Sequence, residues 1–381
     1  MRILFAVQGE GRGHMTQAIA FNDMLVRNGH EVVGVMVGVS HSREVPDFFS
    51  SVFDCDIELL DSPSFVFKNN RSISLPATIS HTVGNLGNYR RSVKKIKQIV
   101  EETKADILIN FYEPTAGLFK RFYPEAIPSI AVGHQFMLEH PDYVSIDKFK
   151  TQKMGMVAFN RLVGSNSHKA ALSFYFAEDM PQQKVTVVPP LLREQLFELE
   201  TGNDGFLLVY LVNHGYSEEI LAWHKEHPKT EIHCFYDKPG ESEENQVDDT
   251  LTFHRLHGRK FLEKMGKAKG VVCTAGFESV CEAAYLDKPI MMVPVENHVE
   301  QELNAIDAEK VDFGVKSSDF NLSKLEAFTG GDGNRTFREW VDRADEVFLN
   351  LILRVAGRGA SRDEAGPAES KFTQPAPVSS E

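Results

Sequence analysis

The stretch Val271-Val272-Cys273-Thr274-Ala275-Gly276-Phe277-Glu278-Ser279-Val280-Cys281-Glu282-Ala283 decides the fold. An apolar run passes through a glycine turn into an amphipathic run, which predicts a buried strand, a loop and a helix. The first N–H groups of such a helix have no partner within it and favour an anion such as phosphate. Glu282 follows Ser279 by three residues, so both lie on one face of the helix, where a carboxylate can accept hydrogen bonds from sugar hydroxyls.

A second polar stretch follows the next apolar run. The acid–amide pair Glu300-Gln301 and, one turn later, Asn304 offer acceptors and donors to a polyhydroxylated ligand. Phosphate, ribose and sugar sites in this order predict a site for a nucleotide sugar. The alternative is an ordinary strand–helix–strand unit in which these polar residues occur by chance.

Both stretches resemble the donor-binding signature of GT-B glycosyltransferases. The likeness is to the branch with the enzyme that adds N-acetylglucosamine to the lipid-linked peptidoglycan precursor, and to the UDP-glycosyltransferases. Gly276-x-x-Ser279-x-x-Glu282 matches the run that holds the diphosphate and ribose in those families. Glu300-Gln301-x-x-Asn304-Ala305 matches the run that touches the donor sugar, and Phe261-Leu262-Glu263-Lys264-Met265 resembles the segment that packs against uracil.

The resemblance implies an α/β fold of the GT-B type, with two doubly wound Rossmann-like domains that face a cleft. It also implies a phosphate loop after the first strand of the second domain, where this chain has Asn213 and Gly215 but lacks the serines of the relatives. The predicted donor-binding residues are Asn213, Gly215, Phe261, Leu262, Thr274, Gly276, Ser279, Glu282, Glu300, Gln301 and Asn304.

The order of apolar and amphipathic runs supports two α/β units. In the first half we expect strands at 2–8, 31–38, 106–110, 128–132 and 185–188, and helices near 13–28, 86–103 and 166–177. Pro189-Pro190 favours extended backbone and marks a linker. The second half should have strands at 206–212, 231–235, 251–254, 270–273 and 290–293, and helices near 216–226, 259–267, 277–286 and 299–310.

These runs predict an acceptor-binding domain over 1–188 and a donor-binding domain over 189–356. The second domain should end in a closing helix over Phe337–Val355, which relatives send back across the first domain. Residues 357–381 are rich in glycine, alanine, serine, proline and charges, and we expect a disordered tail there.

A glycine loop follows the first predicted strand. Gly9, Gly11 and Gly13 permit a close approach to a ligand, but a dinucleotide fingerprint would have a third glycine where this chain has His14. The second predicted strand also ends without a carboxylate, which disfavours NAD and FAD. In the GT-B families the matching loop ends in Gly-His, and the resemblance implies that His14 removes the proton of the acceptor. The alternative is a histidine that only bonds backbone at a helix start.

A base of this kind usually has a carboxylate that orients its second nitrogen. Relatives place an aspartate at the end of a later strand, where this chain has Asn110, so the nearest carboxylate is Glu113. Glu113 could equally serve the dipole at the start of a helix. His134 follows the next strand and should also face the cleft, as a second candidate base or an acceptor ligand.

Composition and charge limit the possible partners. At 381 residues with 42% hydrophobic and 25% charged side chains, the chain is of the soluble globular type, and its four cysteines fit buried thiols in a reducing cytoplasm. The net charge of −13 makes nucleic acid an unattractive partner. Between Ser62 and Val100 there is no acidic residue but there are seven basic ones, namely Lys68, Arg71, Arg90, Arg91, Lys94, Lys95 and Lys97.

This acid-free stretch predicts an anionic partner, either a phosphorylated acceptor or the surface of a membrane. The aromatic and basic segments 65–68 and 119–123 add to the membrane interpretation. The alternative is a solvated helix face near residues 86–103. We therefore expect a cytoplasmic protein that is peripheral at the inner face of the membrane if the acceptor is lipid-linked.

No metal or organic cofactor is expected. Asp54-Cys55-Asp56 has the Asp-x-Asp pattern that binds manganese in the other major glycosyltransferase fold, but it lies in the wrong domain, and no cysteine or histidine cluster has metal spacing. The expected activity is that of an inverting, metal-independent glycosyltransferase with a UDP-linked donor and an unknown acceptor. The alternatives are a UDP-sugar 2-epimerase and a non-catalytic nucleotide-sugar-binding protein.

Overall fold

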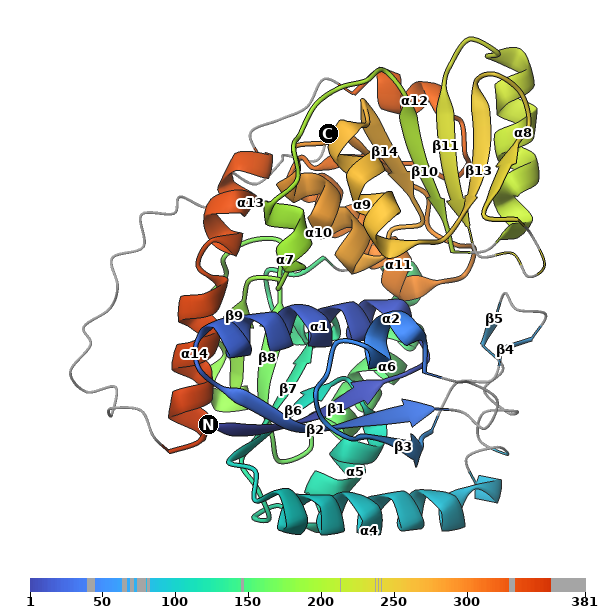
Figure 1. Ribbon diagram of the computed structural model, residues 1–381. Helices are drawn as coiled ribbons and strands as arrows, with labels where there is room; N and C mark the ends of the chain where they lie inside the picture. The colour runs from blue at the N-terminus through green and yellow to red at the C-terminus, as the bar shows by residue number, and fades with distance from the viewer. Residues whose placement is uncertain are drawn as a thin grey trace.

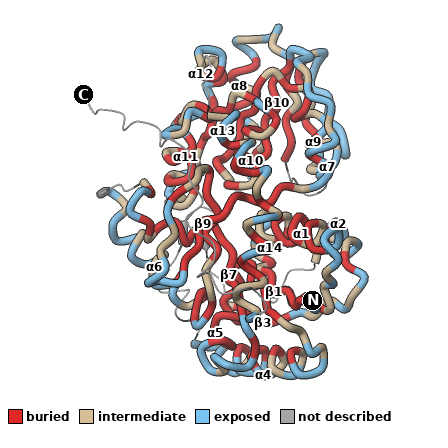
Figure 2. The backbone as a smooth tube through the Cα atoms, turned by 90° about the vertical axis from the view of Figure 1, so that its left-hand side faces the viewer, coloured by how far each residue is buried: buried red, intermediate tan, exposed pale blue. Residues whose placement is uncertain are grey.

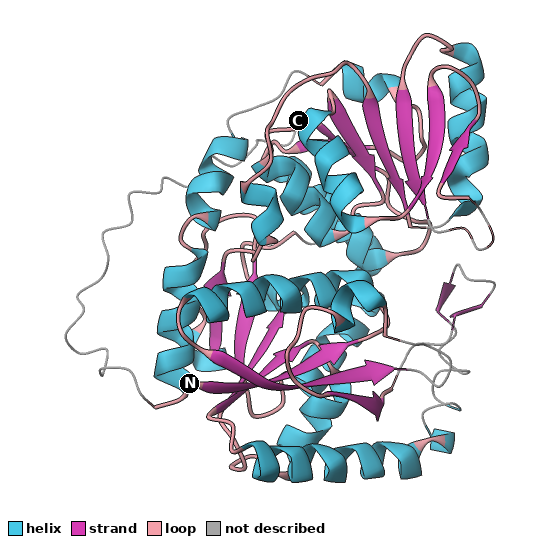
Figure 3. Cartoon of the chain, in the orientation of Figure 1, coloured by secondary structure: helices cyan, strands magenta, loops and turns pink. Residues whose placement is uncertain are grey.

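The computed structural model describes residues 1–39, 45–63, 67–68, 72–73, 80, 83–144, 147–212, 214–236, 238, 240, 242–328 and 333–357. Within this part of the chain, helices cover two seven-stranded sheets, one in each half (Figures 1 and 3). The strands form the buried interior, and the helices present their exposed faces outward (Figure 2). The predicted α/β class is confirmed.

The first sheet is parallel and has the strand order β3-β2-β1-β6-β7-β8-β9. Its interior strand β1 pairs with β2 on one side and with β6 on the other, so that Phe5 lies between Val35 and Ile109. The strands are β1 Arg2–Gln8, β2 Glu31–Val39, β3 Ile57–Asp61, β6 Ile107–Phe111, β7 Ser129–Gly133, β8 His168–Leu172 and β9 Val185–Val188, with a separate ribbon of β4 Phe67–Lys68 and β5 Ser72–Ile73.

The helices of this half are α1 Arg12–Arg27, α2 Asp47–Ser50, α4 Leu86–Thr103, α5 Pro114–Phe122 and α6 Lys150–Val163, with 3₁₀ turns η1 His134–Glu139, η2 Asp147–Phe149 and η3 Pro181–Gln183. The prediction of a helix near 166–177 is wrong, because residues 168–172 form β8. Alanine and leucine favour a helix locally, but the backbone of this segment completes the sheet between β7 and β9.

The second sheet has the order β12-β13-β11-β10-β14-β15-β16 and is parallel except for the edge strand β12. Its strands are β10 Leu207–Leu211, β11 Ile232–Tyr236, β12 Glu244–Gln246, β13 Leu251–Arg255, β14 Gly270–Cys273, β15 Ile290–Met292 and β16 Gly314–Lys316. Its helices are α7 Glu194–Phe197, α8 Ser217–Glu226, α9 Gly258–Lys267, α10 Phe277–Tyr285, α11 Val299–Lys310 and α12 Ser323–Glu326, with the 3₁₀ turn η4 His214–Tyr216.

The closing segment returns to the first sheet. It forms two helices, α13 Gly333–Val341 and α14 Ala344–Val355, where one was predicted, and α14 packs beside β7 and β9 (Figure 1). The Trp340 indole donates a hydrogen bond to the Ser173 carbonyl at 3.1 Å, and Arg27 of α1 forms an ion pair with Asp345. The predicted tail lies outside the described residues beyond Gly357.

Within the described segments, no helix combines the length and the apolar character that a bilayer span requires.

Candidate active site

The start of α10 has no side-chain cap among the described residues. β14 is fully buried, Ala275 takes a left-handed φ of 57°, and Gly276 is the N-cap of the nine-residue helix without a side-chain bond to its N–H groups. The Ser279 hydroxyl donates back to the Gly276 carbonyl at 3.1 Å. The Thr274 hydroxyl is buried and bonds to none of the described residues. The predicted loop and helix are confirmed, and uncapped N–H groups of this kind can bind an anion.

Glu282 lies one turn into α10 and pairs with Arg193, from the segment that connects the two sheets. Arg193 Nε and Nη2 lie 2.8 Å and 2.5 Å from the same oxygen, Oε1 of Glu282. The Glu282 side chain is only 4% exposed, so this carboxylate is held in one orientation. No described residue donates to Oε2. A ribose hydroxyl would therefore meet a fixed acceptor at this place.

The predicted sugar-binding run lies at the start of α11. Glu300 Oε1 accepts a hydrogen bond from Gln135 of the first half at 3.0 Å, and Gln301 Oε1 accepts one from the Val295 N–H at 2.9 Å. Asn304 donates to the Ala275 carbonyl at 3.2 Å, so it supports the loop before α10, and its Oδ1 is buried with no bond to a described residue. This run therefore borders the α10 start.

Other predicted donor residues lie further from these contacts. Phe261 and Leu262 of α9 are buried, and Phe261 packs against the rings of Tyr210 and Phe235. Gly215 is exposed in η4, and Asn213 lies outside the described residues. Their contact with a donor stays a prediction.

The glycine loop carries His14 to the interface of the two halves. The Gly9 N–H donates to the Gly38 carbonyl, and a Cβ at Gly9 would lie 2.6 Å from that oxygen, so only glycine fits there. Gly11 is the N-cap of α1, and Gly13 lies in its first turn against Glu278 of α10. The helix predicted near 13–28 is confirmed as α1, which begins at Arg12.

His14 is held by one ring contact and one hydrogen bond. Its ring stacks on Tyr112 at 5.5 Å, and its Nδ1 lies 3.3 Å from Oε1 of Gln17. No described residue bonds to its Nε2. Burial lowers the pKa of His14 below the usual 6.5, while Glu300 and the bond to Gln17 partly oppose this shift. The lowered pKa favours the neutral imidazole, which is the form that accepts a proton.

The structure does not bring Glu113 to His14. Glu113 caps α5 by accepting from the Thr115 N–H at 2.8 Å, accepts from the Ser62 hydroxyl at 2.6 Å, and lies against Gly38. Burial raises its pKa to about 7. Asn110, at the position where relatives have an acid, bonds to the Glu113 backbone instead. The expected pairing of Glu113 with His14 is thus wrong, because Glu113 serves the start of a helix.

His134 lies at the interface but is packed into it. It is 3% exposed, its ring stacks on Phe277 at 4.1 Å, Nδ1 bonds to the Leu172 carbonyl at 2.7 Å, and Nε2 is 3.3 Å from the Tyr143 hydroxyl. Burial lowers its pKa to about 4. Since both nitrogens have partners, neither is available as a second base in this arrangement, and the ring packs between the two halves. A contact of His134 with the acceptor stays a prediction.

Gln17 and Glu278, to which the sequence interpretation gave no role, join the two halves beside His14. Gln17 Nε2 donates to Glu278 Oε1 at 2.6 Å, which links α1 to α10. Gln17 follows His14 by three residues, so its place beside the ring was available from helical spacing. Its contact with Glu278, and that of Arg193 with Glu282, had no signal in the sequence.

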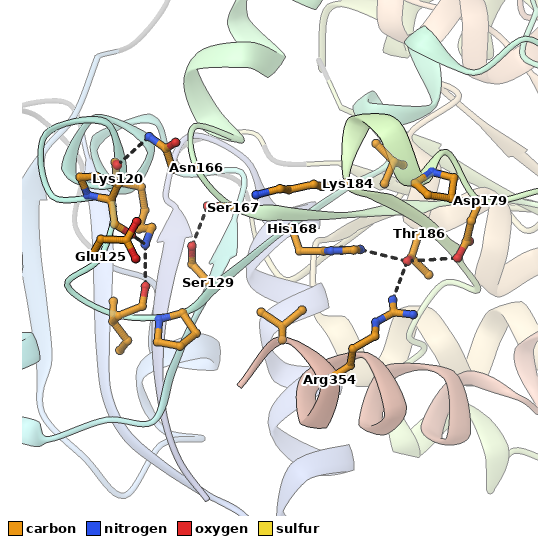
Figure 4. Close-up of a pocket in the computed structure, with 16 residues that line it drawn as sticks. Lys120, Glu125, Ser129, Asn166, Ser167, His168, Asp179, Lys184, Thr186 and Arg354 are labelled. Carbon is orange, nitrogen blue, oxygen red and sulfur yellow. Dashed lines mark hydrogen bonds between the residues drawn. The ribbon is translucent and has the colours of Figure 1, made fainter. Parts of the chain in front are cut away.

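A cavity of about 600 Å³ lies apart from this interface, at the amino ends of β7, β8 and β9 (Figure 4). Its polar groups bond to one another. Thr186 bridges His168, Asp179 and Arg354, and Ser129 bonds to Ser167. Among the described residues, no cluster of three or more histidine, cysteine, aspartate and glutamate side chains could hold a metal ion.

Comparison with solved structures supports the fold. The glycotransferase of kitacinnamycin superposes with a TM-score of 0.62 at 14% identity, over 93% of this chain and 98% of that one. Phytolacca americana UGT2, complexed with UDP-2-fluoroglucose and pterostilbene, gives 0.60 at 12% identity over 93% and 99%. Acinetobacter baumannii MurG gives 0.55 at 13% identity over 93% and 99%. The two sheets thus have the GT-B arrangement.

A search of curated proteins found no match. The family model described as glycosyl transferase family 1 matches residues 1–330, which is most of the chain. The chain is a glycosyltransferase and belongs to glycosyl transferase family 1.

Proposed function

We propose that the protein is an inverting, metal-independent enzyme that transfers a sugar from a uridine-diphosphate sugar to an acceptor hydroxyl. One observation carries the proposal: the start of α1, which holds His14, lies against the uncapped start of α10, since Gln17 of α1 contacts Glu278 in the first turn of α10. A base and an anion site on opposite sides of one interface fit a single displacement at the anomeric carbon.

In this proposal residues 189–356 hold the donor. The diphosphate binds the N–H groups at the start of α10, the ribose binds Glu282, and the sugar lies near Glu300, Gln301 and Asn304. The UDP-2-fluoroglucose complex of Phytolacca americana UGT2, which shares the fold, supports a uridine nucleotide.

The proposed reaction uses a base from α1 on one side of the interface and N–H groups of α10 on the other. His14 Nε2 takes the proton from the acceptor hydroxyl as its oxygen attacks the anomeric carbon. The bond from that carbon to the diphosphate breaks, and the attack from the opposite face inverts its configuration. Charge that develops on the leaving diphosphate is stabilised by the α10 N–H groups and the helix dipole.

Residues 1–188 hold the acceptor in this proposal, in the cytoplasm and at the membrane surface if the acceptor is lipid-linked. Arg90, Arg91 and Lys94 are exposed on α4, which supports an anionic partner. The fold also brings Glu58 of β3 within 2.6 Å of Lys95, so an acid that is absent from the 62–100 stretch reduces its charge. In the 119–123 segment Phe119 is buried and Lys120 bonds to two carbonyls, which leaves Phe122 as its exposed aromatic ring.

The proposal is tested in two steps. Thermal melts with UDP, UDP-glucose, UDP-N-acetylglucosamine and dTDP identify the donor, because a ligand that binds only the folded state raises the melting temperature. Release of UDP in the presence of a panel of hydroxyl acceptors then gives the turnover. His14→Ala should lower kcat by roughly 10²–10⁴-fold, with little change in the shift that the donor causes.

The matched control is His227→Ala, because His227 stacks on Trp223 of α8 in the donor half and not on the interface. Full turnover in His14→Ala would contradict the proposed base. No thermal shift with any of the nucleotides would contradict a nucleotide-sugar donor.

A further inference from the structure

Three side chains form a chain of hydrogen bonds from one half of the protein to the other. His14 Nδ1 lies 3.3 Å from Gln17 Oε1, and Gln17 Nε2 lies 2.6 Å from Glu278 Oε1. Gln17 is 4% exposed, so water does not compete for its amide. The order is imidazole, amide, carboxylate, and the carboxylate comes from the helix that we propose binds the diphosphate.

The direction of the amide follows from the chemistry of Glu278. A glutamine side chain donates from its nitrogen and accepts at its oxygen, whereas an ionised carboxylate only accepts. Ionised Glu278 therefore takes the N–H end of Gln17, and the amide oxygen must face His14. This oxygen accepts only from a protonated Nδ1, so Nε2 keeps its lone pair.

Protonation of Glu278 would reverse donor and acceptor along these hydrogen bonds. A neutral carboxyl can donate to the Gln17 oxygen, which would turn the amide N–H toward Nδ1 and place the imidazole proton on Nε2. The ring could then not take a proton from an acceptor at Nε2.

Several charged groups set the ionisation of these residues. Burial raises the pKa of Glu278 to about 8; the bond from Gln17 lowers it, Glu282 raises it and Arg193 lowers it. The Cys281 thiol is a further ionisable group next to Glu278 on α10. His14 is faced by Glu300 of α11 and by the ring of Tyr112. The positions of the protons along the hydrogen-bonded chain from His14 through Gln17 to Glu278 therefore change near neutral to mildly alkaline pH.

We propose that Glu278 is a positioning residue that acts through Gln17 to hold the proton of His14 on Nδ1, and so leaves Nε2 able to accept the proton of the acceptor hydroxyl. The proposal rests on the base role of His14. It gives that histidine the carboxylate that neither Asn110 nor Glu113 supplies, from the opposite half of the molecule.

The first test is the pH profile of kcat. Glu278→Gln keeps the size and polar contact of the side chain but no longer selects one direction of the Gln17 amide. We expect kcat to fall roughly 10- to 100-fold, as part of what a general base contributes. We expect the wild-type kcat to rise as Glu278 ionises near pH 8, and this rise should be absent from Glu278→Gln. Glu226→Gln, on an exposed part of α8, is the matched control.

The second test exchanges the two groups. Gln17→Glu/Glu278→Gln places a carboxylate beside Nδ1 of His14 and an amide on α10, so the double variant should recover most of the lost kcat. A purely structural role would not be rescued by this exchange. If Glu278→Gln has wild-type kcat and pH profile, or if the exchange recovers nothing in a variant with a wild-type melting curve, the proposal is wrong.

The third test does not depend on activity. The ¹⁵N chemical shifts of the His14 ring should show a proton on Nδ1 in the wild type at pH 9 and a mixture of both tautomers in Glu278→Gln. A ring with the same tautomer in both proteins would overturn the inference. Full turnover in His14→Ala would instead overturn the proposed function, so the two failures are distinguishable.

Discussion

Arg193 and Glu282 form a buried ion pair in which two guanidinium nitrogens bond to the same carboxylate oxygen, at 2.8 Å and 2.5 Å. Arg193 belongs to the segment that connects the two sheets, and Glu282 belongs to α10. The pair therefore links the proposed ribose site to the interdomain connection.

The donor site can be tested at this pair. Glu282→Ala should weaken UDP binding by about 1.5–3 kcal/mol, as expected for a lost hydrogen bond to a charged group. Glu282→Gln should lose less, because it keeps an acceptor for Arg193. Titration calorimetry with UDP measures both, with Glu226→Ala of α8 as the exposed control. Unchanged affinity in folded Glu282→Ala would remove this residue from the site.

Stability should depend on pH through Asp307, which accepts a hydrogen bond from Tyr175 across the interface at 3.0 Å. Burial raises the pKa of Asp307 to about 7, from 3.8 in an exposed chain. The folded state therefore holds a proton that the unfolded state releases, so this contribution is complete below pH 4 and is lost as the pH rises to about 7.

Asp307→Asn keeps the acceptor for Tyr175 and removes the charge. Its melting temperature should exceed that of the wild type at pH 8, and the difference should shrink toward zero near pH 4. Scanning calorimetry over this range is the measurement. A difference that does not change with pH would show that Asp307 does not titrate in this window.

Metal removal should leave the activity unchanged. In the proposed mechanism the N–H groups and the dipole of α10 stabilise the leaving diphosphate. UDP release should therefore have the same kcat in EDTA as in added Mg²⁺ or Mn²⁺. Loss of activity in EDTA with recovery on addition of Mn²⁺ would show that a cation takes this role.

Membrane binding should depend on the exposed cations of α4. Each such residue contributes about 1 kcal/mol near an anionic surface, and salt screens it. The protein should therefore sediment with phosphatidylserine vesicles but not with neutral ones, and less at high salt. Replacing Arg90, Arg91 and Lys94 with serine should abolish sedimentation, whereas Lys225→Ser and Lys229→Ser in the donor half should not. No binding at low salt would favour a soluble acceptor.

The sequence by itself determined the features that depend on consecutive residues. The strand, glycine turn and helix over 271–283 follow from apolar periodicity and from the backbone freedom of glycine, and so does the position of His14 at the start of α1. Most strands of both sheets were predictable for the same reason.

Tertiary structure alone decided which side chains meet. Residues 168–172 form a strand because their backbone pairs with β7 and β9. The Glu113 side chain caps the start of its own helix. Gln17 and Glu278 are 261 positions apart in the chain, and their contact exists only because α1 and α10 pack together. Burial and electrostatic pairing depend on the whole fold, so the partner of His14 could not be read from local spacing.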